Sequence, residues 1–331
     1  MSSPILPPGK LPPGLLAELL PDAADLPAEV RVGPRIGEDA CAIAVEGGSL
    51  IAATDPITLF GSGVASHAVW INANDVAVMG VEPRWFLANV MLPIGTREDE
   101  VRDLFASMQE ALGELGAVLV GGHSEITGAV NMPLVVGQML GWCEGERFVT
   151  TGGVRPGDVI LQVGQTPVEG ALVIADARPD VDVDPPLLAR ARQALRDPGI
   201  SVVAPALLAA RLGATALHDP TEGGLATAIH EMAEAGEVAI VDLDPAAVLW
   251  FEPGVALCRA IGADPWGTLA SGALLAAFGP DEASAARDAL TAQGHEVAEI
   301  ARAEAGSGVT RTDGTPLPRF ERDELSRVLD S

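Results

Sequence analysis

Five short segments of the chain combine acidic side chains with amide, hydroxyl or glycine residues. They are GEDA (37–40), TDPIT (54–58), INANDVAVMGVE (71–82), GGHSEIT (121–127) and HDPTEGG (218–224). In proteins, Mg²⁺ takes a few carboxylate oxygens and fills its other positions with water and phosphate, and exposed backbone N–H groups bind phosphate. We therefore predict that the five segments meet at one nucleotide–metal site.

Two of the carboxylates flank a predicted β-hairpin. Residues 42–45 and 49–53 are apolar and are separated by a Gly-Gly pair, which is typical of two strands joined by a turn. Asp39 precedes the first strand and Asp55 follows the second, so both are expected at the same end of a sheet. A single Asp in such a place is more often a turn or cap residue. Two of them in adjacent arms, together with Asp75, are sufficient for Mg²⁺.

The segment from Asn72 to Asp75 places polar side chains in an apolar run. Residues 66–80 are predicted to form a helix. Its valines and Met79 would form the side that is buried in the core. Asn72, Asn74 and Asp75 suit the N-terminal end of a helix, where unpaired backbone N–H groups attract oxygen atoms. We therefore expect the chemistry at that end.

The GGHSEIT segment offers a possible phosphate contact. Gly121 and Gly122 follow a predicted strand, and their N–H groups would face phosphate. Ser124 would donate a hydrogen bond, and His123 or Glu125 would meet the metal or the substrate. An ordinary turn with its polar residues facing water explains the same string equally well.

The HDPTEGG segment lies between a predicted strand and a predicted helix. Thr221, Glu222 and the N–H groups of Gly223 and Gly224 would therefore lie at a helix N-terminus, which suits an anion. Capping alone explains the threonine about as well. Gly37, in the first segment, would let the backbone approach a phosphate closely.

The elements that position these segments indicate a mixed α/β fold. After a predicted strand at 84–93, apolar residues repeat every three or four positions over 98–115, which predicts a helix. We divide the chain into an N-terminal arm (1–30) and two units, 31–150 and 151–331. Further strands are predicted at 118–120, 134–142, 159–163, 214–217, 238–241, 274–277 and 297–300, and helices at 187–195, 202–212, 225–235 and 281–293.

The amino-acid composition excludes several classes of protein. A net charge of −26 excludes binding of nucleic acid through phosphates, which needs clustered Lys and Arg. Lys10 is the only lysine, so a P-loop is excluded. The three cysteines are far apart and are expected to be reduced, and no apolar run is long enough to cross a membrane. We expect a cytoplasmic protein without a membrane segment.

Taken together, the five segments resemble the AIR synthase or PurM-like superfamily. This superfamily includes AIR synthase, FGAM synthetase, thiamine-monophosphate kinase, selenophosphate synthetase and HypE. The string NDVAVMGVEP (74–83) is similar to HypE and AIR synthase, and GEDA with TDPIT is similar to the paired acidic motifs of the kinase. HDPTEGGL lies between the DPTRGGL-like string of HypE and the DISDGL-like string of the kinase. The matches keep their order over residues 33–300.

The resemblance implies a PurM-like architecture of two domains. The N-terminal domain, with its mixed sheet, would join that of a second copy to form the barrel of a homodimer, and an α/β domain would follow. ATP and Mg²⁺ would be the cofactors, and a small molecule would be the substrate. The implied metal ligands are Asp39, Asp55, Asp75, Asp219 and Glu222.

The resemblance also implies roles for the remaining segments. Asn72 and Asn74 would position the nucleotide or the metal shell. His123 and Ser124 occupy places where relatives use an acid, or His, followed by Thr. We take Asp55, Asp75 and His123 as the catalytic candidates.

The implied reaction is transfer of phosphate from ATP to an oxygen, which in the dehydrating members turns an amide oxygen into a leaving group. HypE-type proteins end in a cysteine that receives the carbamoyl group, whereas this chain ends in RVLDS. That difference argues against a dehydratase that acts on its own tail. Two alternatives stay open, a small-molecule kinase of the thiamine-monophosphate kinase type and a non-catalytic nucleotide-binding scaffold with a partner protein in a maturation complex.

Overall fold

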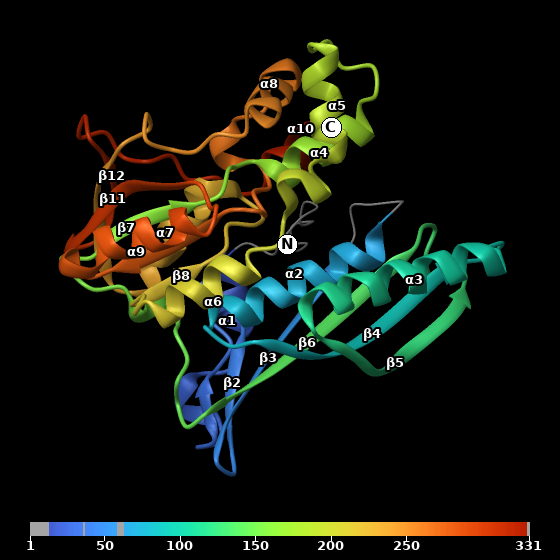
Figure 1. The fold of residues 1–331 in the computed structure, drawn as a ribbon, viewed down its shortest axis with the longest axis horizontal. Coiled ribbons are helices and arrows are strands. Elements are labelled where there is room, and N and C mark those ends of the chain that lie inside the picture. Colours follow the sequence, from blue (N-terminus) through green and yellow to red (C-terminus); the bar gives the residue numbers. More distant parts are fainter. Residues whose placement is uncertain (1–12, 36, 58–62, 330–331) are drawn as a thin grey trace, which may run out of the picture.

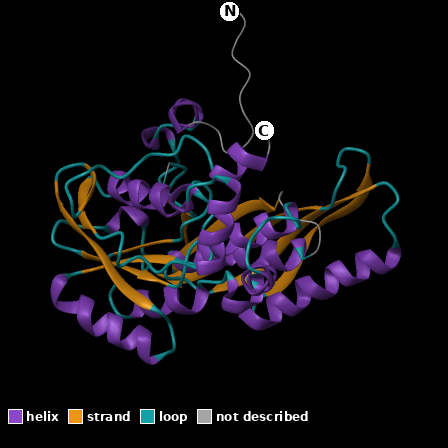
Figure 2. Cartoon of the chain, turned by 90° about the horizontal axis from the view of Figure 1, so that it is seen from above, coloured by secondary structure: helices purple, strands orange, loops and turns teal. Residues whose placement is uncertain are grey.

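The computed structural model of the chain describes residues 13–35, 37–57 and 63–329. Its strands form two six-stranded sheets, which lie side by side with helices between and around them (Figures 1 and 2). The mixed α/β class expected from the sequence is therefore confirmed. Of the expected N-terminal arm, residues 1–12 lie outside the described part of the chain.

The first sheet is built from the N-terminal half of the chain and has the strand order β1-β2-β3-β6-β4-β5. β4 and β5 are parallel, and the other neighbouring strands are antiparallel. The expected hairpin is confirmed, because β2 pairs with β3. The strands are β1 (Val30–Val32), β2 (Cys41–Val45), β3 (Gly48–Ile57), β4 (Pro83–Pro93), β5 (Val118–Thr127) and β6 (Leu134–Glu144).

Two strands of this sheet are longer than the sequence predicts. β3 continues to Ile57 because it pairs with β6 over its whole length, so Asp55, opposite Gly137, lies within the strand and not after it. β5 includes the whole GGHSEIT segment (121–127), because its pairing with β4 continues to the end of that segment. The expectation that this strand ends before Gly121 was wrong.

The second sheet is built from the C-terminal half of the chain and has the order β12-β9-β11-β7-β10-β8. β12 and β9 are parallel, and the other neighbouring strands are antiparallel. β12 was not predicted, and neither were three helices of this half, α4 (Val168–Ala177), α8 (Glu252–Ile261) and α10 (Glu324–Leu329). The strands are β7 (Val159–Val163), β8 (Ala216–His218), β9 (Val238–Leu243), β10 (Leu274–Phe278), β11 (Val297–Ala305) and β12 (Gly308–Arg311).

Helices cover both faces of the second sheet. Val159 and Leu161 of β7 belong to the same hydrophobic core as residues of α6 and α9, whereas Ile160 belongs to the core of α7. A strand that is buried on both faces has no polar side to expose, which explains why four of its five residues are apolar, while the amide of the buried Gln162 donates to Gly164 O and Leu249 O. The longer helices of this half are α4 (Val168–Ala177), α5 (Pro185–Gln193), α6 (Val203–Arg211), α7 (Gly224–Ala235), α8 (Glu252–Ile261) and α9 (Pro280–Ala292).

Helix α2 (Val64–Val78) lies at the centre of the molecule, against the first sheet, α3 (Glu98–Leu115) and α6 (Figure 1). Every residue of α2 is buried, including Asn72, Asn74 and Asp75. The helix begins at Val64, about two turns before these polar residues. The expectation that they mark its N-terminal end was therefore wrong, and their chemistry has to be explained from the interior of a buried helix.

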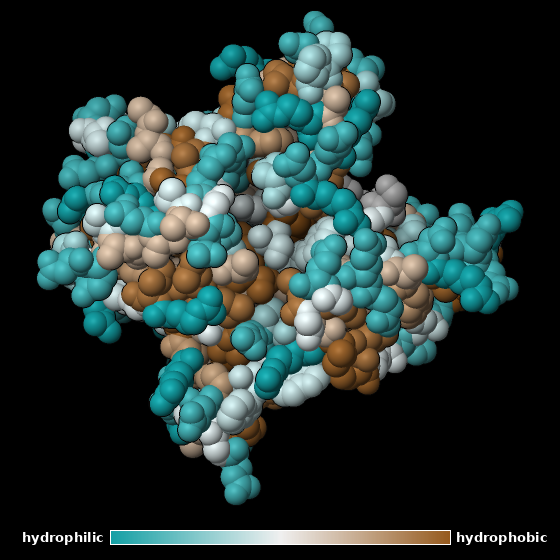
Figure 3. All heavy atoms as spheres, in the orientation of Figure 1, coloured by the Kyte–Doolittle hydropathy of each residue, from teal (hydrophilic) through white to brown (hydrophobic). Residues whose placement is uncertain are grey.

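The surface reflects the acidic composition. Hydrophilic residues predominate on the outer parts of the visible face, and hydrophobic residues show mainly toward the middle of the molecule (Figure 3). Among the described residues, no helix combines the length and the apolar character that crossing a bilayer requires.

Candidate active site

Two predicted metal ligands from opposite halves of the chain meet beside His218. Asp39 lies just before β2 of the first sheet, and His218 and Asp219 lie at the end of β8 in the second. Asp39 Oδ2 is 2.8 Å from His218 Nδ1, across 179 positions of sequence. The GEDA and HDPTEGG segments are therefore brought together.

His218 is held between two carboxylates. Its Nε2 is 3.1 Å from Oε2 of Glu231 on α7, and its side chain is 3% exposed. Carboxylate oxygens only accept hydrogen bonds, so both ring nitrogens donate. Burial opposes a positive charge on the ring, but Asp39 and then Glu231 outweigh it and hold the pKa of His218 well above its usual value.

Asp219 is the most unusual group of the site. It is 1% exposed, and neither of its carboxylate oxygens has a hydrogen-bond partner among the residues that the structure describes. Burial, followed by the negative charge of Asp39, raises the pKa of Asp219 to about 8; His218 opposes the shift and Asp55 adds to it. A buried carboxylate without donors, near two further carboxylates, is an arrangement that a cation would stabilise.

Asn72 fixes the backbone at Asp55. Its Oδ1 accepts a hydrogen bond from Asp55 N at 2.8 Å, and its Nδ2 donates to the carbonyls of Asp55 and Ala68 at 3.2 and 2.8 Å. β6 makes room for this amide with Gly137, because a Cβ there would collide with Asn72. Asn72 therefore fixes the strand backbone from which the Asp55 side chain extends.

Asn74 connects α2 to the second half of the chain. Its Nδ2 donates to Ile200 O at 2.9 Å, and its Oδ1 accepts from Val202 N at 2.8 Å. Both polar atoms of this amide are thus bound to the backbone that precedes α6. Asp75 follows on the same helix and is 4% exposed.

A cavity of about 340 Å³ opens next to the carboxylates. Its lining includes Gly37 and Asp39 from the first half of the chain and Thr221, Glu222 and Gly223 from the second. Five of the residues proposed from the sequence therefore line one cavity. The other lining residues are Leu16, Arg35, Glu38, Thr227, Glu231, Phe320, Glu321, Arg322 and Asp323.

Protein acceptors already occupy the N–H groups of Gly223 and Gly224. α7 begins at Gly224, one residue before the predicted start at Leu225, with Gly223 as its N-cap. Gly223 N donates to Asp323 Oδ2 at 2.8 Å, and Gly224 N donates to Thr221 O at 3.0 Å. Burial raises the pKa of Asp323 to about 7. Sequence reasoning missed Asp323, His218 and Glu231.

The GGHSEIT residues lie away from this cluster within one chain. Gly121, Gly122, His123 and Ser124 belong to β5 at the edge of the first sheet, and the His123 side chain is 64% exposed. Gly122 is aligned with Asp55 across the sheet, and the two are separated by the intervening strands β4 and β6. Three strand spacings amount to about 14 Å.

The carboxylates do not form a complete metal cage. In the described part of the chain, no group of three or more His, Cys, Asp or Glu residues has the geometry to hold a metal by itself. The two unpaired oxygens of Asp219 nevertheless provide ligands of the kind that Mg²⁺ prefers. The residues therefore fit Mg²⁺ that arrives with phosphate, because the phosphate completes the coordination.

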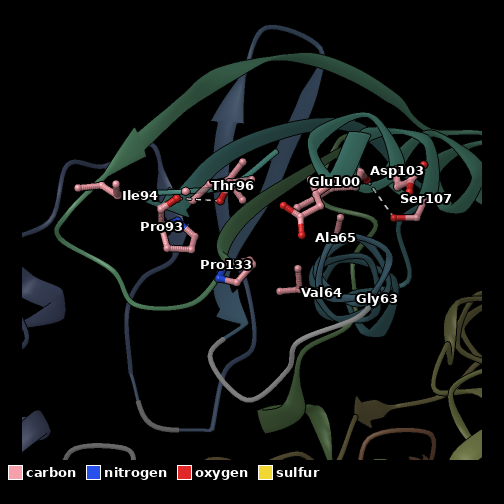
Figure 4. Close-up of a pocket in the computed structure, with 13 residues that line it drawn as sticks. Gly63, Val64, Ala65, Pro93, Ile94, Thr96, Glu100, Asp103, Ser107 and Pro133 are labelled. Atoms are coloured by element: carbon pink, nitrogen blue, oxygen red, sulfur yellow. Dashed lines mark hydrogen bonds between the residues drawn. The ribbon is translucent and has the colours of Figure 1, made fainter. Parts of the chain in front are cut away.

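A second cavity, of about 730 Å³, contains none of the residues proposed from the sequence. It lies between the first turn of α2, the end of β4 and the first turns of α3, where Thr96 and Glu100 contribute polar side chains (Figure 4). No titratable cluster like that of Asp39 and Asp219 is found among its described lining residues.

The same two-part organisation is found in known proteins. Residues 37–143 match the family described as AIR synthase related protein, N-terminal domain, and residues 155–314 match its C-terminal domain. Carbamoyl dehydratase HypE of Cupriavidus necator is 29% identical over 276 residues, which cover 81% of this chain and 76% of that protein. HypE of Rhodobacter capsulatus is 31% identical over 264 residues, which cover 76% of this chain and 74% of that protein.

Solved structures show the same fold. The HypE–HypF complex superposes with a TM-score of 0.72 at 22% identity and covers 84% of this chain and 93% of the matched one. HypE in complex with ATP gives a TM-score of 0.70 at 24% identity, covering 85% and 88%. AaThiL complexed with AMPPCP and TMP gives 0.70 at 20% identity, covering 87% and 91%. The chain belongs to the AIR synthase related, PurM-like family, and its sequence is HypE-like.

Proposed function

We propose that the chain is an ATP- and Mg²⁺-dependent enzyme that transfers phosphate from ATP to an oxygen of a small substrate or an amide. One observation carries this proposal. Asp219 has two buried oxygens without partners among the described residues, and its pKa responds to Asp39 and Asp55 from the other half of the chain. A cluster of carboxylates that is unfavourable by itself becomes favourable around a metal-bound triphosphate.

In this proposal Asp39, Asp55 and Asp219 bind the metal, and Asp75 and Glu222 complete the acidic set. When bound, Mg²⁺ supplies positive charge that stabilises the charge developing on the transferred phosphoryl group. Asn72 helps to position the ligand Asp55, because it accepts a hydrogen bond from the backbone N–H of that residue. Gly37, Thr221 and Gly223 shape the wall of the cavity next to the phosphates.

We also propose a homodimer joined through the first sheets, with the boundary between the two domains near residue 150. β5 is an edge strand along which Val118, Val120 and Ile126 are 54%, 54% and 52% exposed, and such an edge favours pairing with another chain. A second copy paired at this edge would also form a cleft between the two chains, into which His123 and Ser124 could point.

Relatives support the finer assignment. The HypE proteins that match this chain are named carbamoyl dehydratases, and solved structures include HypE with ATP and HypE with HypF. Amide activation is therefore our first choice of reaction, and a maturation protein is a candidate partner. Product analysis separates amide activation from kinase activity, because a kinase leaves the phosphate on its substrate whereas amide activation releases it.

Thermal unfolding with Mg²⁺ and ATP tests the metal–nucleotide site. A ligand at about 100 times its Kd stabilises the native state by about 2.7 kcal/mol, which for a chain of 331 residues raises Tm by about 4 °C. We expect this shift in the wild type and its loss in Asp55→Asn and Asp75→Asn, with ATP plus EDTA as the control. The assignment is wrong if both variants keep the full shift.

A further inference from the structure

Two buried histidine–carboxylate pairs join the halves of the molecule. His218 of β8 contacts Asp39 at 2.8 Å, and His67 of α2 contacts Glu169 of α4 at 2.6 Å. The histidines are 3% and 1% exposed. The first pair includes a proposed metal ligand and the second does not, so the two form a matched comparison.

The ring of His218 is fixed on both sides. Nδ1 faces Asp39 Oδ2, and Nε2 faces Glu231 Oε2 at 3.1 Å. Thr151 Oγ1 lies 3.4 Å from Nδ1 and donates to Leu217 O at 3.2 Å. Such a ring has one orientation, and so does the carboxylate oxygen that it binds.

We propose that His218 is a positioning residue of the metal site, a role that rests on the proposed function. It donates Nδ1–H to Asp39 Oδ2 and thereby leaves Oδ1 as the oxygen that meets the cation. Glu231 sets the ring from the opposite side. Because Asp39 belongs to the first half of the chain and His218 to the second, this bond also fixes how the carboxylates of the two halves face each other.

Two effects of removing the ring oppose each other. Loss of its positive charge reduces repulsion of the incoming cation and would strengthen binding. Loss of its hydrogen bond lets Asp39, which is 18% exposed, turn toward solvent, and removing such an outer-shell partner commonly weakens metal binding by about 10–100-fold. We expect orientation to dominate, because an Asp39 carboxylate that has turned toward solvent no longer supplies a ligand to the cation.

The test measures binding of Mn²⁺ together with adenylyl imidodiphosphate by titration calorimetry and by electron paramagnetic resonance, whose line shape responds to ligand geometry. We expect His218→Gln to weaken Mn²⁺ binding about tenfold or more and to alter the resonance. His67→Gln removes the matched pair and should change the affinity by less than about twofold, since an interaction outside the cluster adds independently. Glu231→Gln keeps the Asp39 contact and should give an intermediate loss of about threefold.

Each outcome decides a different point. Absence of Mn²⁺–nucleotide binding to the wild type overturns the proposed function itself. If the wild type binds, unchanged or tighter binding to His218→Gln overturns the positioning role while the proposed function stands. An equal loss in His67→Gln overturns it too, because the effect would then be a general one on the contact between the halves. If His218→Gln does not fold, Glu231→Gln decides, and unaltered affinity and resonance refute the proposal.

Discussion

Replacing Asp219 by Asn should stabilise the ligand-free chain and abolish its response to Mg²⁺ and ATP. In the folded chain the pKa of Asp219 rises from 3.8 to about 8, so the folded state keeps this proton to a higher pH than the unfolded state does. The stability that the protonated group contributes is complete below pH 3.8 and is lost as pH rises toward about 8. Up to pH 7 this loss is about 4 kcal/mol, at 1.36 kcal/mol per pKa unit.

The Asn variant has no charge to bury at this position, so its stability should not fall over the same range. Its amide still lacks partners in the described part of the chain, which costs about 1–3 kcal/mol. We therefore expect a net gain of about 1–3 kcal/mol at pH 7, the difference between these two amounts. Loss of the Mg²⁺–ATP response should accompany the gain, because sites of function often cost stability.

Urea denaturation of both proteins at intervals between pH 5 and pH 8.5 measures the effect. The difference in unfolding free energy should grow with pH and level off near the pKa of the buried group. The raised pKa of His218 gives a contribution that is present below its usual pKa and is lost as pH rises through the folded value. Both proteins share that histidine, so the difference curve reports mainly on Asp219. Parallel curves, or a variant that is less stable throughout, would refute the reasoning.

Three further predictions concern the surroundings of the site. Gly137→Ala should lower Tm and reduce Mg²⁺–ATP binding, because the added Cβ collides with Asn72 and overpacking costs about 1–3 kcal/mol; an unchanged Tm contradicts this. Val120→Lys should convert the proposed dimer to a monomer in sedimentation velocity, since a charge blocks an exposed edge strand; a wild type that is monomeric, or a variant that stays dimeric, would mean that β5 is not the interface. Asp323→Ala should cost about 1–3 kcal/mol in urea denaturation near pH 4, because it removes the acceptor of Gly223 N and Leu325 N, and the cost should shrink toward pH 7, because the buried carboxyl, with its pKa raised to about 7, itself loses stability over that range; equal stability at pH 4 would show that water replaces this acceptor.

Helices whose apolar residues repeat with a clear helical period were predictable from the sequence, and helices that are buried on all sides were not. α3 has one apolar and one charged side, and its bounds were predicted at both ends. α4 is buried along most of its length, so VEGALVIADA has no polar face and no helical period to detect. β5 was predicted to end before its glycines, because the parallel pairing with β4 that carries the strand through them joins residues far apart in the sequence.

The site shows the same division. Asp39 was recognisable because it precedes a strand of the predicted hairpin, whereas the resemblance of the HDPTEGG segment to the family motif pointed to Asp219. The role of His218 was not, because it depends on a contact across 179 positions. The support that Asn72 gives to the backbone at Asp55 follows from the packing of α2 on β3, which no local pattern encodes.

A crystal structure with Mg²⁺ and a non-hydrolysable ATP analogue tests the central claim most directly. We expect Mg²⁺ about 2.1 Å from oxygens of at least two carboxylates among Asp39, Asp55 and Asp219, with the triphosphate along the wall formed by Thr221 and Gly223. Phosphates bound elsewhere, with Asp219 still buried and without a ligand, would contradict the claim.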